Sequence, residues 1–173
     1  MALLVVVYLA AIVSANLLVT QFGPYAGIII SFFFIALDLT VRDALHDRWS
    51  EGHLWPKMLA LIASGSILSY LVNSDSSQIA IASFLAFLSA GISDAVVYQA
   101  LKEHPVVMRM NASNLVSALF DSVVFVVVAF GFPIMIPVVI GEYGAKLMGG
   151  FVWSLILTRF HKPSWSFSCE HPS

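Results

Sequence analysis

The sequence is poor in charged residues. Of its 173 residues, 8 are Lys or Arg and 10 are Asp or Glu, so 10% are charged, whereas 60% are hydrophobic. A soluble domain has about 25% charged residues, because polar side chains must cover its surface in water. This composition therefore excludes a soluble globule and predicts a protein that lies in a lipid bilayer. The net charge of −2 also leaves no basic surface for nucleic acid.

Residues that build metal centres and catalytic motifs are also scarce. The single cysteine, Cys169, excludes a disulfide framework and a cysteine-built metal cluster. The five histidines fall in predicted loops or the tail, and none has a second His or Cys at metal-ligand spacing. The motifs GxxxxGK[ST], GxSxG and HExxH do not occur. We therefore expect no enzyme, no bound metal and no cofactor.

The sequence contains long apolar runs. A transmembrane helix needs about 20 mostly apolar residues. Six runs fit, separated by polar residues or Gly-Pro breaks: residues 2–22, 25–43, 54–72, 78–101, 110–131 and 133–160. The short connections leave no room for a soluble catalytic domain. The sequence thus predicts an all-α integral membrane protein with six transmembrane helices, formed by one domain over residues 1–160 and a short cytoplasmic tail over residues 161–173.

The basic residues predict how these helices are oriented. Seven of the eight fall in the loops and tail on one side of the six-helix topology, and only Lys146 lies well inside a span. Lys and Arg collect in cytoplasmic loops of membrane proteins. We therefore place both the N-terminus and the C-terminus in the cytoplasm.

Four acidic residues lie within the predicted spans. Asp38, Asp94, Asp121 and Glu142 belong to the second, fourth, fifth and sixth spans. An acidic residue near the centre of a transmembrane helix costs about 2.5–3.5 kcal/mol, so such side chains normally face the interior of the bundle or a wet cavity. These four acids therefore predict a shared site between the helices.

Two of the acids have a basic residue four positions later. Asp38 precedes Arg42, and Glu142 precedes Lys146. Residues four apart share a helix face, so each pair can neutralise itself. Each pair either contributes to a ligand site or forms a salt bridge that holds helices together.

Polar and small residues accompany the acids. Asn114 lies on the same helix face as Asp121, and Asn16 is a polar residue of the first span. Asn16 either contacts a ligand or forms a hydrogen bond between helices. Glycines surround Glu142 in the sixth span, where they either permit close helix packing or leave room for a ligand: Gly141, Gly144, Gly149 and Gly150.

Several segments resemble the queuosine precursor transporter family, also called the vitamin uptake transporter family. They are SFFFIALDLTVRD (31–43), ASFLAFLSAGISDAVVY (82–98), NASNLVSALFDSVVFVVVAF (111–130) and EYGAKLMGG (142–150). The SAN segment at 14–16 fits the polar position of the family's first helix. These segments follow the family order over most of the chain.

The resemblance implies an importer in the cell inner membrane. Its substrate would be 7-cyano-7-deazaguanine or the aminomethyl analogue, which cells salvage for tRNA modification. The expected partners are this deazaguanine, the lipid bilayer and, as an option, a second copy of the chain in a homodimer. The alternative is a substrate-binding membrane subunit that needs a partner ATPase to transport a vitamin-like molecule.

The acids suit such a substrate. A guanine-like edge presents an N–H and an NH₂ side by side, and one carboxylate can accept hydrogen bonds from both. Any of Asp94, Asp121 and Glu142 fits this role, and a basic residue would balance the remaining negative charge. The residues that we predict to bind substrate are Asn16, Asp38, Arg42, Asp94, Asn114, Asp121, Glu142 and Lys146.

Overall fold

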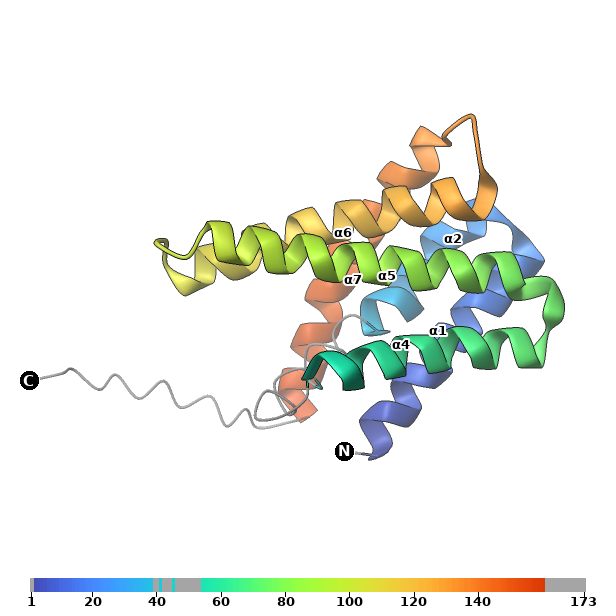
Figure 1. Cartoon of the computed structure of the whole chain (residues 1–173), viewed down its shortest axis with the longest axis horizontal. Coiled ribbons are helices and arrows are strands. Elements are labelled where there is room, and N and C mark those ends of the chain that lie inside the picture. Colours follow the sequence, from blue (N-terminus) through green and yellow to red (C-terminus); the bar gives the residue numbers. More distant parts are fainter. Residues whose placement is uncertain (1, 39–40, 42–44, 46–53, 161–173) are drawn as a thin grey trace, which may run out of the picture.

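The computed structural model describes residues 2–38, 41, 45 and 54–160 (Figure 1). This part of the chain is helical and contains no strand, which confirms the predicted all-α class. Its elements are α1 (Ala2–Phe22), α2 (Pro24–Ile30), η1 (Ser31–Ile35), α4 (Leu54–Val72), η2 (Ser74–Ser76), α5 (Ser77–Ala100), α6 (Val106–Phe130) and α7 (Ile136–Phe160).

Two glycines with positive φ angles end long helices. Gly23, at φ +78°, ends α1, and its N–H donates to the carbonyl of Val19 at 2.8 Å. Pro24 then occupies the first turn of α2, where a residue without an N–H costs nothing. Gly131, at φ +77°, ends α6 in the same way. Glycine adopts this backbone conformation without steric cost, so these residues fix where the chain turns.

The structure refines three of the predicted helices. The fifth begins at Val106 rather than at residue 110. The last one begins at Ile136 rather than at Pro133, because Pro137 fits the first turn of α7. The second continues from α2 into η1, a π-helical turn, and its described part runs to Asp38. A π-helical turn accommodates an extra residue in the helix and is frequent at functional sites.

The helices form a closed ring. The chain packs α1 against α2 and α4, α4 against α5, and α5 along the full length of α6. The ring closes because α7 contacts both α6 and the α2–η1 segment. In Figure 1, α5 and α6 run side by side as a long hairpin whose end near residues 101–105 projects away from the other helices. The interior of the ring is where side chains from several helices can meet.

The distribution of side chains is that of a membrane protein. Large apolar residues are exposed on the outside of the helices, for example Leu3, Leu71 and Phe151, whereas Asn16, Glu142 and other polar residues are buried. Among the described residues, three helices are long and apolar enough to cross a membrane, namely Ala2–Phe22, Ser74–Ala100 and Asn111–Phe130. The segments Pro24–Asp38 and Pro56–Val72 form shorter apolar helices.

Candidate functional site

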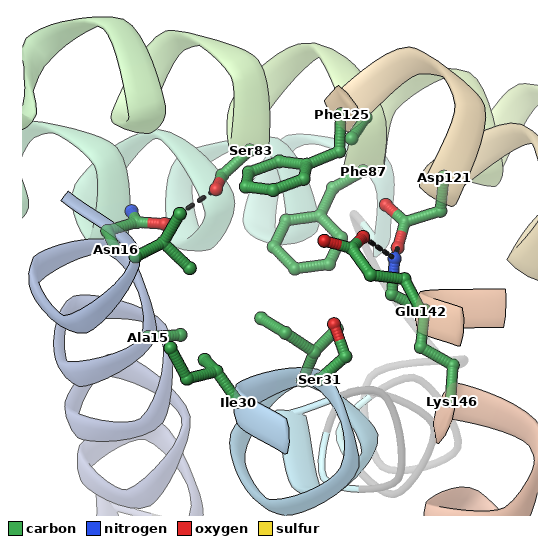
Figure 2. Close-up of a pocket in the computed structure, with 13 residues that line it drawn as sticks. Ala15, Asn16, Ile30, Ser31, Ser83, Phe87, Asp121, Phe125, Glu142 and Lys146 are labelled. Carbon is green, nitrogen blue, oxygen red and sulfur yellow. Dashed lines mark hydrogen bonds and ion pairs between the residues drawn. The ribbon is translucent and has the colours of Figure 1, made fainter. Parts of the chain in front are cut away.

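A cavity lies inside the helix ring (Figure 2). Its lining combines polar and apolar residues from α1, α2, η1, α5, α6 and α7: Ala15, Asn16, Val19, Ile30, Ser31, Ile35, Ser83, Ala86, Phe87, Asp121, Phe125, Glu142 and Lys146. Its volume is about 20 Å³, which is enough for a water molecule but far below the roughly 300 Å³ of a typical small-molecule site. The cavity is therefore too small, as the structure describes it, for a ligand of that size.

One wall of the cavity carries three charged side chains that contact one another. Lys146 Nζ lies 2.8 Å from Asp121 Oδ2 and 3.3 Å from Glu142 Oε2. It also donates to the hydroxyl of Ser122 at 3.0 Å, and that hydroxyl donates to the carbonyl of Ala118. The predicted pair of Glu142 and Lys146 thus exists, and Asp121 joins it from the neighbouring helix. We call Asp121, Glu142 and Lys146 the charged cluster.

The charged cluster leaves two acceptor atoms unused. Asp121 Oδ1 and Glu142 Oε1 are buried, and neither has a hydrogen-bond partner in the described part of the chain. In Figure 2 each carboxylate directs one oxygen to Lys146 and the other away from it. A buried acceptor without a hydrogen-bond partner destabilises the folded protein by roughly 1–3 kcal/mol, and a charged acceptor does so by more. Two such atoms facing one cavity are therefore suited to N–H donors of a ligand.

Asn16 and Ser83 lie on the opposite wall (Figure 2) and belong to a neutral hydrogen-bond network that also includes Ser69, behind the lining. Asn16 Nδ2 donates to Ser69 Oγ at 2.9 Å, and Ser83 Oγ donates to Asn16 Oδ1 at 2.6 Å. Ser69 Oγ in turn donates to the carbonyl of Gly65 at 2.8 Å. We call Asn16, Ser69 and Ser83 the neutral network. It joins α1, α4 and α5 and uses both ends of the Asn16 amide.

Two aromatic rings and a helix irregularity complete the lining. Phe87 from α5 and Phe125 from α6 border the space between the two walls (Figure 2). Rings in such positions can stack on a flat heterocycle. Ser31 and Ile35, the first and last residues of the π-helical turn η1, line the cavity from the side of the second helix.

Glycines bring α7 close to the second helix. A Cβ added at Gly141 would lie 2.5 Å from Ile28 Cδ1, and one at Gly149 would lie 2.5 Å from the carbonyl oxygen of Phe32. Gly144 and Gly150 have open space instead. Gly27 of α2 packs against the carboxylate of Glu142, because a Cβ there would lie 2.7 Å from Glu142 Oε1. Close packing therefore accounts for two of the four predicted glycines, and Gly27 makes room for the carboxylate of Glu142.

Of the eight predicted substrate-binding residues, the structure brings four together. Asn16, Asp121, Glu142 and Lys146 line the cavity and are at most 4% exposed. Three of the others lie away from the cavity. Asp38 is fully buried but does not line the cavity, Asp94 is half-buried on α5, and Asn114 is exposed on α6. Arg42, and with it the predicted pair with Asp38, lies outside the described residues.

Sequence reasoning missed several lining residues. Ser31, Ser83, Phe87 and Phe125 line the cavity, and Ser122 binds Lys146 next to it. Ser122 directly follows Asp121, but consecutive residues do not share a helix face, so this spacing gave no signal for the contact with Lys146. Ser31 begins the family-like segment 31–43, and Ser83 lies in the family-like segment 82–98. Serines also occur at helix contacts without a ligand, however, so these positions alone did not indicate a site. For the two phenylalanines no signal separates them from the other eleven.

Comparison with known proteins supplies independent information. Residues 2–160 match a family model described as "Putative vitamin uptake transporter". The match covers every described helix. The search of curated proteins and the search of solved structures found no match.

Proposed function

The chain belongs to the vitamin uptake transporter family, and on this basis we propose that it imports a queuosine precursor, 7-cyano-7-deazaguanine or its aminomethyl analogue. The proposal includes six transmembrane helices, both ends in the cytoplasm and a location in the cell inner membrane. The apolar exterior of the helices and the distribution of basic residues support this topology.

The observation that carries the proposal is the pair of unused carboxylate oxygens in the cavity. A deazaguanine offers an N–H and an NH₂ on one edge, and Asp121 Oδ1 is a buried acceptor with no partner among the described residues. Because the dielectric constant in a closed cavity is low, a hydrogen bond between these donors and a carboxylate is stronger there than in water. The rings of Phe87 and Phe125 lie beside the same space and can hold a flat base.

Transport requires that the cavity open. At about 20 Å³ it is too small for a base, so a substrate enters only when the helices around it separate. Transporters commonly bind substrate between helices with an irregular backbone and expose the site to one side at a time. The π-helical turn η1 gives the cavity such a segment.

The proposal is tested by rescue of cells that cannot make the precursor. Expression of this chain is expected to restore queuosine in tRNA when either deazaguanine is supplied at a nanomolar concentration. Asp121→Asn keeps the size of the side chain but removes its charge, and it is expected to abolish this rescue. Asp75→Asn, at an exposed acid between α4 and α5, is the matched control and should rescue fully.

Rescue by Asp121→Asn at the same protein level would overturn the proposed site. Uptake by the purified protein alone in liposomes would exclude the alternative, a binding subunit that depends on a partner ATPase. No uptake of either compound in cells that contain the folded protein would overturn the proposed substrate.

A further inference from the structure

The formal charges of the charged cluster do not balance. Asp121 and Glu142 carry two negative charges when both are ionised, whereas Lys146 carries one positive charge. All three side chains are at most 4% exposed, and the other described residues that line the cavity are uncharged. A buried charge without compensation is strongly unfavourable. One proton bound to either carboxylate makes the cluster neutral.

The space around the carboxylates suits a proton rather than a larger cation. The amino group of Lys146 already lies between the two carboxylates, 2.8 Å from Asp121 Oδ2 and 3.3 Å from Glu142 Oε2 (Figure 2). Glu142 Oε1 is buried against Gly27, where a Cβ would lie 2.7 Å from it. A metal ion needs several oxygen ligands around it, whereas a proton needs a single oxygen and almost no volume.

Glu142 is better placed than Asp121 to hold this proton. Lys146 Nζ lies nearer to Asp121 than to Glu142, so it stabilises the negative charge of Asp121 more strongly. Asp121 is also the carboxylate that we propose to bind the edge of the base, which requires that it be ionised. A cluster with ionised Asp121, Lys146 and protonated Glu142 is neutral and still offers Asp121 Oδ1 to the substrate.

The helices packed against Glu142 bring few titratable groups near it. They are Asp121 on α6, Lys146 and Tyr143 on α7, Tyr25 on α2 and Asp38 beyond η1. Tyr25 is exposed at the start of α2, and neither Tyr143 nor Asp38 lines the cavity. Among the described lining residues, the charges that act on Glu142 are therefore those of Asp121 and Lys146.

We infer that uptake is coupled to the inward movement of one proton, which Glu142 carries while Asp121 binds the base. This inference rests on the proposed function and deepens it, because it names what drives transport. Glu142 takes up the proton from water when the cavity opens to the outside, and the helices then close around a neutral cluster. When the cavity opens to the cytoplasm, water reaches the carboxyl group, and the proton and the substrate leave on that side.

Accumulation in liposomes tests the coupling. The liposomes contain the purified protein, the membrane potential is held at zero with potassium and valinomycin, and the outside is one pH unit more acidic than the inside. We expect labelled deazaguanine to reach about ten times its outside concentration, because one pH unit corresponds to a factor of ten for one proton per substrate. A protonophore should abolish this accumulation. Accumulation driven instead by a sodium gradient at equal pH would overturn the inference.

Glu142→Gln assigns the proton to its residue. Glutamine keeps the size of the side chain and one acceptor oxygen, but it cannot release a proton. At saturating substrate, this variant should exchange labelled for unlabelled compound across the membrane, with a lower affinity, and should lose the accumulation. Glu103→Gln, at an exposed acid between α5 and α6, is the matched control and should accumulate normally. Accumulation by folded Glu142→Gln protein would overturn the role of Glu142.

A direct measurement of proton entry does not depend on any variant. A pH-sensitive dye inside liposomes with the unchanged protein should report acidification when substrate is added outside, and uptake without acidification would overturn the coupling. The outcomes for the proposed function and for the inference differ. If neither deazaguanine enters, the proposed function is overturned and the inference with it. If substrate enters only to equal concentrations in spite of the pH gradient, the proposed function holds and the proton coupling alone is overturned.

Discussion

The two walls of the cavity differ in how their polar atoms are paired. In the neutral network, Asn16 uses its amide nitrogen and its amide oxygen in hydrogen bonds to Ser69 and Ser83. In the charged cluster, Lys146 contacts one oxygen of Asp121 and one of Glu142, while the second oxygen of each carboxylate has no hydrogen-bond partner in the described residues. Both walls are buried to a similar extent.

This difference separates a structural role from a ligand-binding role. A buried polar network with its hydrogen bonds formed stabilises the contacts between helices, so α1, α4 and α5 are held together by the neutral network. A buried group with unused acceptors raises the energy of the closed state until a donor arrives. We therefore expect substitutions in the neutral network to change mainly stability, and substitutions in the charged cluster to change binding, except where they remove the cation.

Removal of the cation should have the largest effect. Lys146→Met preserves the length of the side chain but leaves two buried carboxylates close together without a counter-ion. Breaking a buried ion pair in this way destabilises a protein by about 3–5 kcal/mol. We expect a large fall in the unfolding temperature of the purified protein in detergent and loss of uptake.

A double variant and a surface variant serve as controls. Lys146→Met combined with Glu142→Gln removes one of the two carboxylates and should recover part of the lost stability. Lys102→Met, at an exposed position between α5 and α6, should change the unfolding temperature little. Normal stability of the single Lys146→Met variant would show that the charged cluster is not held together by its cation.

Breaking the neutral network should have an intermediate effect. Asn16→Ala leaves the buried hydroxyls of Ser69 and Ser83 without their contacts to the amide, at a cost of about 1–3 kcal/mol. We expect a lower unfolding temperature, while the affinity of the folded protein for substrate changes less than in Asp121→Asn. Asn114→Ala replaces the same residue type at an exposed position and should stay within about 0.5 kcal/mol of the unchanged protein. If Asn16→Ala retains its stability and loses substrate binding, Asn16 has a ligand-binding role like that of the charged cluster.

The smallest effect on stability should come from Gly27→Ala. The added Cβ would lie 2.7 Å from Glu142 Oε1, and this flexible carboxylate can move aside without disturbing the backbone. We expect an almost unchanged unfolding temperature but about tenfold weaker binding of substrate, because the acceptor Glu142 Oε1 is displaced. Gly144→Ala, on α7 with open space around it, should leave both quantities unchanged. Equal behaviour of these two variants would show that Gly27 does not position Glu142.

Most of the helical architecture could be predicted from the sequence. The predicted helices 2–22 and 54–72 coincide with α1 and α4, because Gly23 and the polar residues after Val72 interrupt long apolar runs. The π-helical turn η1 could not be predicted, since its sequence SFFFI has no local feature that distinguishes it from an ordinary helix. The number of membrane crossings and their orientation stay predictions.

The candidate site could be predicted only in part. Asn16, Asp121, Glu142 and Lys146 meet in the cavity because polar residues in apolar helices turn inward. Asn114 shares a helix face with Asp121 but is exposed, and it belongs to the half of α6 nearer the projecting end of the hairpin (Figure 1). Helical periodicity gives the direction of a side chain but not where the neighbouring helices end. The contact between Asp121 and Lys146 depends on that tertiary arrangement as well.

The connection at Gly23 limits how the cavity can open. With only this residue between α1 and α2, the two helices cannot slide apart and can move relative to each other only as arms of a hinge. Along the second arm, at a rise of about 1.5 Å per residue, a rotation of about 10° moves Ser31 by about 2 Å and Asp38 by about 4 Å. Because α7 packs closely against this second helix at Gly141 and Gly149, the same rotation would also displace Glu142. A small angular change at one glycine is thereby amplified with distance from the hinge into a displacement of the wall that holds the charged cluster.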